Sequence, residues 1–393
     1  MNAMENEPSS FRKPMRKYSV LVVDTGQSGA EEIVELVTRT GDYRAERARI
    51  ESVITNPHAH APDIVVLDLG SPTTSELEVL AEIRGHYGDV PVIIVSEALD
   101  DAQMRRLLKL KIHDWHRKPL GQADFHASLN SSIRNAKQLS TRVHAVISAM
   151  AGAGGTTVAI SITDALARSL AKQKASVGLF DLDFSSGSCG MMLNLSTTLN
   201  LDSIITQPER IDHEFVSLIQ QKHPHDFHLY SFKRRDFVTH LNGYELVLRL
   251  LDAVTMEHAH TVLDVPYYEV DWAQDVLSAV NTATIVCEMN IPSIKHALDL
   301  LKTIRALPGA PKQANVLINK CETGLFKRSR IPAAKLKELF GDTPYRLLPR
   351  DDSTFAEALD RGVVPGDVNG RSKFEREIAR YVKDTMLTEK AAK

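Results

Sequence analysis

Short apolar segments alternate with amphipathic segments along most of the chain. In the first third, nearly continuous apolar runs predict buried strands, and segments whose hydrophobic residues recur every three or four positions predict helices. The predicted strands are 18–24, 63–69, 90–96 and 111–116, and the predicted helices are 30–40, 77–87, 102–110 and 123–139. Strands that are apolar on both faces and alternate with helices indicate a parallel sheet covered on both sides.

A second alternation of the same kind begins just after residue 140. Its predicted strands are 143–149, 176–183, 260–266, 282–290 and 313–320, and its predicted helices are 157–173, 271–280 and 292–307. The segment between them, 184–255, is less regular and holds helical candidates near 211–221 and 243–255. The expected fold class is α/β, with two doubly wound parallel-sheet domains. We place a disordered arm at 1–17, the first domain at 18–139 and the second at 140–393.

The composition is that of an ordinary globular protein, since 43% of the 393 residues are hydrophobic and 25% are charged. The 47 basic and 50 acidic residues nearly cancel, so no strong nucleic-acid-binding surface is expected. The apolar runs are too short to span a bilayer, and acids interrupt the basic C-terminal helix, so direct membrane binding is not expected. With three widely spaced cysteines and no apolar leader segment, we expect a cytoplasmic protein with free thiols.

Four chemically active side chains follow the predicted strands of the first domain: Asp24, Asp68, Ser96 and Lys118. In a doubly wound sheet, ligands bind beyond the carboxyl ends of the strands, so these side chains are expected to converge. A carboxylate between a hydroxyl and an ammonium can accept a phosphoryl group. Asp68 would attack, Ser96 and Lys118 would bind phosphate oxygens, and Asp24 would help to hold Mg²⁺.

The segments that carry these residues, 20–24, 62–72, 90–96 and 116–119, resemble the response-regulator receiver domain. The resemblance implies a receiver or flavodoxin-like fold, with Asp68 as the phospho-acceptor and Trp115 as an aromatic switch residue. The sequence departs from the family at Thr25, where a second acid usually stands beside Asp24. Two interpretations stay open: a module for protein contacts that no longer accepts phosphate, and a working phospho-acceptor.

A glycine-rich segment lies between a predicted strand and a predicted helix in the second domain. Glycines let backbone N–H groups curl around phosphate, and the helix N-terminus favours negative charge. The candidate nucleotide-binding residues are Gly152, Ala153, Gly154, Gly155, Thr156 and Thr157. The usual P-loop motif has a lysine where Gly155 stands, so a purely structural turn is the alternative.

Later strands of the same domain add acids and an asparagine in a fixed order, with Asp181 and Asp183 first, then Asp264, then Asn319. This set resembles the MinD/ParA group of deviant Walker ATPases. The resemblance implies that Thr156, Asp181 and Asp264 hold Mg²⁺, and that Asp183 is a catalytic acid that positions water. The base-binding edge that it implies consists of Asn319, Lys320, Pro349 and Arg350.

Both cations of the MinD/ParA motif are missing. Met150 stands at the signature-lysine position and Gly155 at the P-loop lysine position. Because phosphoryl transfer depends on stabilising phosphate charge, we do not expect efficient ATP hydrolysis, while binding of ATP and Mg²⁺ stays open. The candidates for a substitute charge are Lys172, Lys320, Arg328 and Arg350.

The order of the two domains, together with segment 263–301, resembles the CpaE/TadZ family of Flp (Tad) pilus assembly proteins. This resemblance implies a cytoplasmic homodimer that marks a cell pole and recruits pilus assembly proteins, including the secretion ATPase. The expected function is therefore a localisation scaffold with a degenerate Walker A loop. Two alternatives remain, namely an ATPase switch that controls dimerisation and localisation, and a phosphorylation-controlled output protein.

Overall fold

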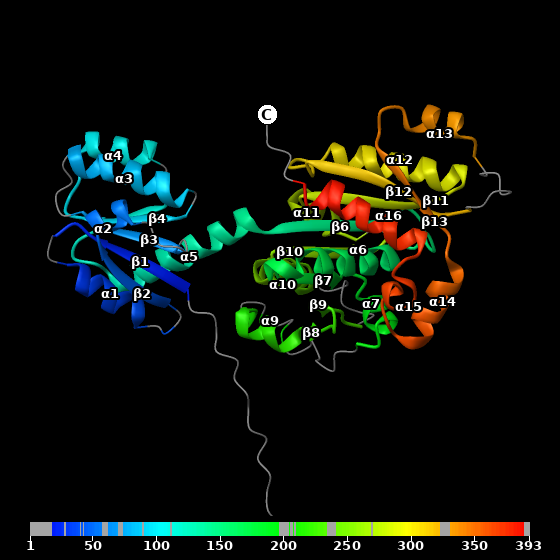
Figure 1. Cartoon of the computed structure of the whole chain (residues 1–393), viewed down its shortest axis with the longest axis horizontal. Coiled ribbons are helices and arrows are strands. Elements are labelled where there is room, and N and C mark those ends of the chain that lie inside the picture. The colour runs from blue at the N-terminus through cyan, green and yellow to red at the C-terminus, as the bar shows by residue number, and fades with distance from the viewer. Residues whose placement is uncertain are drawn as a thin grey trace, which may run out of the picture. The chain divides into compact units, whose positions relative to one another are not determined.

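We analysed a computed structural model of the chain (Figure 1). It describes residues 18–26, 29–39, 41, 43–56, 62–69, 74–88, 90–110, 112–195, 204, 207, 210–233, 241–268, 270–322 and 331–388. The chain divides into two compact units, Met1–Ser140 and Thr141–Lys393. The predicted arm at 1–17 and the predicted cation Arg328 lie outside the described residues.

The first unit is a five-stranded parallel sheet with the strand order β2-β1-β3-β4-β5. Its strands are β1 Tyr18–Asp24, β2 Tyr43–Arg49, β3 Ile64–Leu69, β4 Val92–Ser96 and β5 Asp114–Arg117. Its helices are α1 Ala30–Thr38, α2 Ile50–Thr55, α3 Thr74–Tyr87, α4 Asp101–Lys109 and α5 Gln122–Ser140. Separate apolar cores lie on the two faces of the sheet, as expected for apolar strands covered on both sides.

Strand β2 is absent from the sequence prediction. Its sequence, YRAERAR, is mostly polar, and after the buried Tyr43 its residues are half-buried or exposed. It pairs with β1 alone at the edge of the sheet, so it does not need the continuous apolar run that marks the central strands. The hydrophobic pattern therefore finds the central strands and overlooks this edge strand.

The second unit is an eight-stranded sheet with the order β13-β12-β11-β6-β10-β7-β9-β8. Its strands are β6 Arg142–Ser148, β7 Val177–Asp181, β8 Gln221–Lys222, β9 Phe227–Tyr230, β10 His260–Val265, β11 Thr282–Glu288, β12 Gln313–Cys321 and β13 Tyr345–Pro349. All pairings are parallel except that of β8 with β9. The predicted class, two doubly wound α/β sheets, is confirmed, with one antiparallel edge strand added.

Helices cover both faces of this second sheet (Figure 1). They include α6 Gly155–Leu170, α7 Ser188–Met192, α9 His213–Ile219, α10 Leu241–Glu257, α11 Ala273–Ala279, α12 Ile291–Arg305, α13 Ala333–Phe340, α14 Asp352–Arg361, α15 Pro365–Asn369 and α16 Lys373–Tyr381. Short helical segments occur at Ala171–Gln173 and Val382–Met386. Within the part of the chain that the structure describes, no helix is both long and apolar enough to cross a membrane.

Buried and half-buried histidines gather at the amino ends of the central strands. His144 of β6 stacks on His260 of β10, with 3.0 Å between their ring nitrogens. His258, only 3% exposed, lies within hydrogen-bond distance of Ser176 Oγ at 2.6 Å and of Tyr230 Oη at 2.8 Å. Burial lowers the pKa of His258 to about 3, so this ring is neutral inside the folded unit.

Candidate functional site

Two groups of polar side chains lie at the carboxyl ends of the strands, one in each unit. In the first unit, Asp68 near the end of β3 is fully buried, and Lys118 Nζ lies 2.6 Å from its Oδ1. Gly29 packs so closely that a Cβ there would lie 2.7 Å from Lys118 Nζ and 2.9 Å from Asp68 Oδ2. Burial raises the pKa of Asp68, and Lys118 opposes that rise. The predicted pair of acid and lysine is therefore in direct contact.

Asp24, the second predicted acid, is bound to an arginine that the sequence reasoning did not consider. Arg47 of β2 donates to Asp24 Oδ2 from Nε at 3.1 Å and from Nη2 at 2.6 Å, and it also pairs with Glu31 at 2.8 Å. Burial alone would raise the pKa of Asp24, but hydrogen bonds from Arg47 and Gly26 and the arginine charge lower it. The carboxylate is thus ionised and neutralised by the protein's own cation.

This arrangement does not fit a receiver-type Mg²⁺ site. Magnesium prefers a nearly octahedral shell of oxygens that includes one or two free carboxylates. Here Asp24 is held by a guanidinium, and the neighbouring Thr25 uses its hydroxyl to donate to the Asp68 carbonyl oxygen at 2.7 Å. Neither residue presents an uncommitted carboxylate beside Asp68.

Ser96, the fourth predicted residue, is also committed. Its Oγ donates to the Glu97 carbonyl at 2.9 Å and accepts a hydrogen bond from Trp115 Nε1 at 2.8 Å. The hydroxyl donor is therefore used by the backbone, and the indole of the predicted switch residue occupies an acceptor position. The pocket keeps the shape of a phospho-acceptor site. Asp24, Ser96 and Lys118 are already paired within it, whereas Asp68 Oδ2 is buried without a hydrogen-bond partner.

The glycine-rich segment of the second unit forms a loop between β6 and α6. Gly152 and Gly154 have φ values of 77° and 95°, in the left-handed region that glycine adopts most readily. The Gly155 N–H donates to Ser148 Oγ at 2.9 Å, and a Cβ at residue 155 would collide with that same oxygen. The loop is closed on Ser148, so a side chain at residue 155 would force the Ser148 hydroxyl to move and would break its hydrogen bond with the Gly155 N–H.

The end of β12 reaches onto this loop. Asn319 Nδ2 donates to the Ala153 carbonyl at 3.0 Å, and a Cβ on Gly154 would lie 2.5 Å from the same nitrogen. Lys320 Nζ lies 2.6 Å from both the Gly152 carbonyl oxygen and Glu288 Oε1. The two residues that the MinD/ParA resemblance places at the nucleotide base thus contact the P-loop itself.

The other predicted base-edge residues lie apart from the P-loop contacts. Pro349 ends β13 and pairs with Cys321, and the Arg350 N–H donates to the Cys321 carbonyl. The Arg350 guanidinium binds Asp352 at 2.7 Å and Glu322 at 3.4 Å. Within the described ranges, neither residue hydrogen-bonds to the P-loop.

A buried acidic cluster lies beside the loop. Ligand atoms of Asp181, Cys189 and Asp264 all lie within 4.8 Å of one another. Asp264 accepts hydrogen bonds from Thr156 and from the Cys189 thiol, whereas Asp181 accepts from Ser231 Oγ and the Cys189 N–H. Burial raises the pKa of both carboxyl groups. The charge of Asp183 raises both pKa values further, and the charge of Asp181 also raises that of Asp264.

This donor set fits a divalent cation. No lysine or arginine among the described residues pairs with Asp181 or Asp264, so their negative charge has no cationic partner. Two carboxylates and a hydroxyl are ligands that Mg²⁺ prefers. Thr156, Asp181 and Asp264 would hold the Mg²⁺ of a nucleotide complex, and the ion would supply positive charge there.

Asp183, the predicted catalytic acid, is held by its own surroundings. Its Oδ1 accepts hydrogen bonds from the Ser185 N–H at 3.1 Å and the Tyr268 hydroxyl at 2.8 Å, and its Oδ2 accepts from Ser186 Oγ at 2.7 Å. These bonds fix the turn that leads from β7 into α7. In this arrangement the carboxylate orders a turn, and its acceptor positions are largely used.

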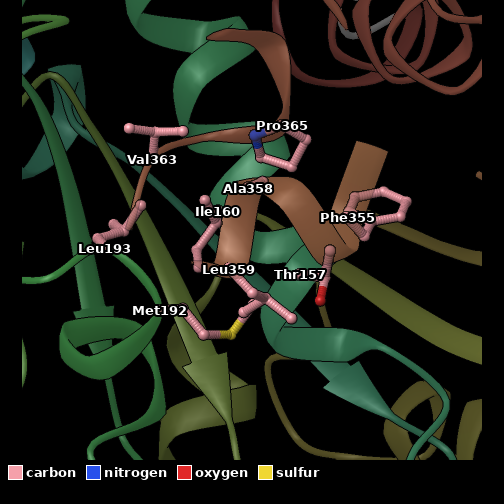
Figure 2. Close-up of a pocket in the computed structure, with 9 residues that line it drawn as sticks. All are labelled: Thr157, Ile160, Met192, Leu193, Phe355, Ala358, Leu359, Val363 and Pro365. Atoms are coloured by element: carbon pink, nitrogen blue, oxygen red, sulfur yellow. The ribbon is translucent and has the colours of Figure 1, made fainter. Parts of the chain in front are cut away.

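An apolar pocket lies next to the first turn of α6 (Figure 2). Figure 2 shows Thr157, a predicted nucleotide-binding residue, at the edge of this pocket among apolar side chains from α7, α14 and the α14–α15 loop. The lining residues are Thr157, Ile160, Met192, Leu193, Phe355, Ala358, Leu359, Val363 and Pro365. Because the lining is almost entirely apolar, this pocket suits an aliphatic group and is not a phosphate site.

Several functional contacts come from residues that the sequence analysis did not select: Arg47, Ser148, Cys189, Ser231, Tyr268 and Glu288. Ser148 could have been selected from the sequence, because it is a small polar residue that ends the apolar strand before the glycine-rich loop. Arg47 lies in the polar edge strand, and Cys189 and Ser231 belong to the irregular segment, so no pattern marked them.

Comparison with known proteins identifies the first unit. Residues 20–130 match the model of the response regulator receiver domain. The transcriptional regulatory protein KdpE of Mycobacterium tuberculosis is 37% identical over 75 residues, which is 19% of this chain and 33% of that protein. CreB of Escherichia coli K12 is 22% identical over 127 residues, 32% of this chain and 56% of that protein. The chain therefore spans about a third to a half of the curated relatives that it matches.

The second unit has solved structural neighbours. A ParA family ATPase from Chlorobium tepidum has a TM-score of 0.52 at 20% identity, covering 62% of this chain and 98% of that one. MinD from Pyrococcus horikoshii, solved with Mg-ADP, has a TM-score of 0.50 at 14% identity, covering 64% and 100%. The chain thus joins a receiver domain to a domain with the MinD/ParA fold.

Proposed function

We propose that this protein is a localisation scaffold for Flp (Tad) pilus assembly and hydrolyses ATP weakly or not at all. The observation that carries the proposal is the P-loop closed on Ser148, where glycine stands at the lysine position and a Cβ at residue 155 would collide with Ser148 Oγ. Phosphoryl transfer depends on stabilising the phosphate charge, and loss of one stabilising group typically lowers the rate by orders of magnitude. A fold that keeps the shape of an ATPase without that charge suits a binding role.

In this proposal, the protein acts in the cytoplasm as a homodimer at a cell pole. The domain with the MinD/ParA fold provides the dimer contact, and the receiver domain binds or targets partners. The proposed partners are pilus assembly proteins, including the secretion ATPase. The coarse part of this role, regulation and positioning, is supported by the joining of a receiver domain to a MinD/ParA-type fold.

The test combines ATP turnover with localisation in a host that assembles these pili. We expect a fluorescent fusion to form a polar focus, and phosphate release to match that of a Thr156→Ala, Asp264→Ala variant. Pilus formation should survive in that variant, because the scaffold does not need hydrolysis. Turnover well above the variant, with loss of the focus when both residues are changed, would contradict the proposal.

The ATPase switch is the second candidate, and the buried acidic cluster favours it. Asp181 and Asp264 keep a donor set suited to Mg²⁺, although such buried acids are costly without a cation. If this candidate is correct, nucleotide should change the fraction of dimer measured by light scattering. An unchanged dimer fraction at saturating nucleotide would favour the scaffold.

A further inference from the structure

Lys320 has an unusual backbone and an unusual position. Its φ is 55°, in the left-handed region that residues other than glycine rarely adopt. The pairing of β12 with β13 shifts register between Ile318 and Cys321, and the Lys320 N–H donates to Asn319 Oδ1 at 2.8 Å. This local bend turns the lysine side chain toward the P-loop, where its ammonium donates to the Gly152 carbonyl.

Lys320 is the one lysine or arginine, among the residues that the structure describes, whose side chain hydrogen-bonds to the loop 150–157. Arg350, another candidate cation, binds acids elsewhere. Lys172 follows α6 and therefore lies at the opposite end of that helix from the P-loop. The geometry thus separates three candidates that the sequence left equal.

We propose that Lys320 supplies the phosphate-binding charge that the P-loop lacks. Its ligand is the polyphosphate of a nucleotide with Mg²⁺. In the free protein, Glu288 holds the ammonium at 2.6 Å, and the side chain is 41% exposed, so it is free to exchange this carboxylate for phosphate. Glu288 is then a competitor of the ligand. This inference goes beyond the proposed scaffold role, which stands whether or not nucleotide binds.

If Glu288 competes with the ligand for Lys320, substitutions at the two residues should change ligand affinity in opposite directions. Charge-assisted hydrogen bonds contribute about 1.5–3 kcal/mol, and each 1.4 kcal/mol is tenfold in affinity. Lys320→Met should weaken binding of Mg²⁺-ATP and of Mg²⁺-pyrophosphate by about tenfold or more. Lys320→Arg should stay much closer to the wild type. Glu288→Gln should tighten binding of both probes several-fold, because the lysine no longer has a carboxylate partner.

The experiment is calorimetric titration of the full chain with each probe, and Lys172→Met is the matched control. A purely structural clamp predicts that Lys320→Met and Glu288→Gln weaken binding alike. That result would overturn the proposal, as would wild-type protein that binds neither probe at millimolar concentration. An effect on ATP without one on pyrophosphate would also overturn it, since it would place Lys320 at the base.

Protein folding is checked by the thermal unfolding midpoint of each variant. If Lys320→Met is unfolded, the Glu288→Gln titration decides alone, because tightening supports the proposal and weakening or no change overturns it. None of these titrations measures turnover or localisation, so failure here is distinguishable from failure of the scaffold proposal.

Discussion

The two strand-end pockets treat their carboxylates in opposite ways. In the receiver domain, Asp24 touches Arg47 and Asp68 touches Lys118, so each acid has a cation of the protein in contact. In the domain with the MinD/ParA fold, Asp181 and Asp264 are bound by hydroxyl, thiol and amide donors. The described part of that domain offers them no ion pair.

The difference teaches what each pocket still needs. A pocket whose acids are neutralised by the protein's own cations does not need a bound cation, and a metal would have to displace Arg47 from Asp24 to enter it. A pocket whose buried acids have no cationic partner pays a desolvation free energy, and a bound cation or a proton removes that penalty. We therefore expect ligand-free stability to depend on pH near neutrality mainly through the second unit.

Glu375 of α16 gives the largest expected effect. Its Oε1 is buried without a hydrogen-bond partner, and burial, followed by repulsion from Asp164, raises its pKa to about 7. A raised carboxyl pKa costs stability as pH rises from about 4.5 through 7. Glu375→Gln should therefore stabilise the protein by about 2–3 kcal/mol at pH 8 and have little effect at pH 4.

Chemical denaturation at both pH values measures this effect. Glu377→Gln is the matched control on the same helix, because that carboxylate pairs with Arg346 and Arg380. It should stabilise at neither pH. A gain for Glu375→Gln that is equal at pH 4 and pH 8 would show that the carboxyl charge is not the cause.

For His258 we expect the opposite dependence of stability on pH. Its folded pKa of about 3 lies far below the value of 6.5 for a free histidine, so stability that it contributes above pH 6.5 is lost as pH falls. The destabilisation caused by His258→Gln should be largest at pH 8. The destabilisation should be about 2 kcal/mol smaller at pH 5. At that pH the histidine is protonated in the unfolded chain but stays neutral in the folded protein, so the wild type is itself less stable. Denaturant titrations at the two pH values provide the test, with exposed His296→Gln as control. A penalty that stays constant with pH would contradict the prediction.

Restoring the P-loop lysine should harm the fold. Gly155→Lys places a Cβ against Ser148 Oγ, and overpacking of this kind costs about 1–2 kcal/mol. Ser148→Ala combined with Gly155→Lys should recover part of that loss, because the colliding oxygen is gone. A double-mutant cycle of unfolding free energies measures the coupling, and a purely additive result would show that the two positions do not collide.

The smallest effect is expected at Arg47, whose side chain is 43% exposed. Arg47→Ala should lower the unfolding midpoint of the receiver domain at pH 7, because Asp24 loses the cation that lowers its pKa. The deficit should fade as pH drops and the carboxylate protonates, and millimolar Mg²⁺ should reverse part of it at pH 7. Fluorescence of Trp115 in a Trp272→Phe background reports this unit, since these are the two tryptophans of the chain. Arg44→Ala on the same strand is the control, and an equal loss there would refute the pairing argument.

The sequence predicts central features well and edge features poorly. The strands that carry Asp24, Asp68 and Asp264 are continuous apolar runs, and their positions follow from hydrophobicity alone. Strand β2 is mostly polar and lies at a sheet edge, so the hydrophobic pattern does not predict it and Arg47 is overlooked with it.

The contacts around the P-loop could not be predicted from the sequence for a different reason. The bond of Gly155 to Ser148 depends on the exact curl of a loop, which spacing in the sequence does not determine. Cys189 and Ser231 reach Asp181 from a segment without regular periodicity. Placing such donors requires the three-dimensional path of the chain, whereas the acids that they bind are fixed by strand ends.

The reactivity of the Cys189 thiol can report how often the acidic cluster opens locally. Its pKa is raised well above the ordinary value, because it is fully buried and faces two carboxyl groups. Alkylating reagents attack the thiolate and need access, so the folded cluster should be inert and reaction should require a local opening that exposes Cys189. The rate of Cys189 alkylation therefore measures how often the pocket opens, without a label introduced by mutation.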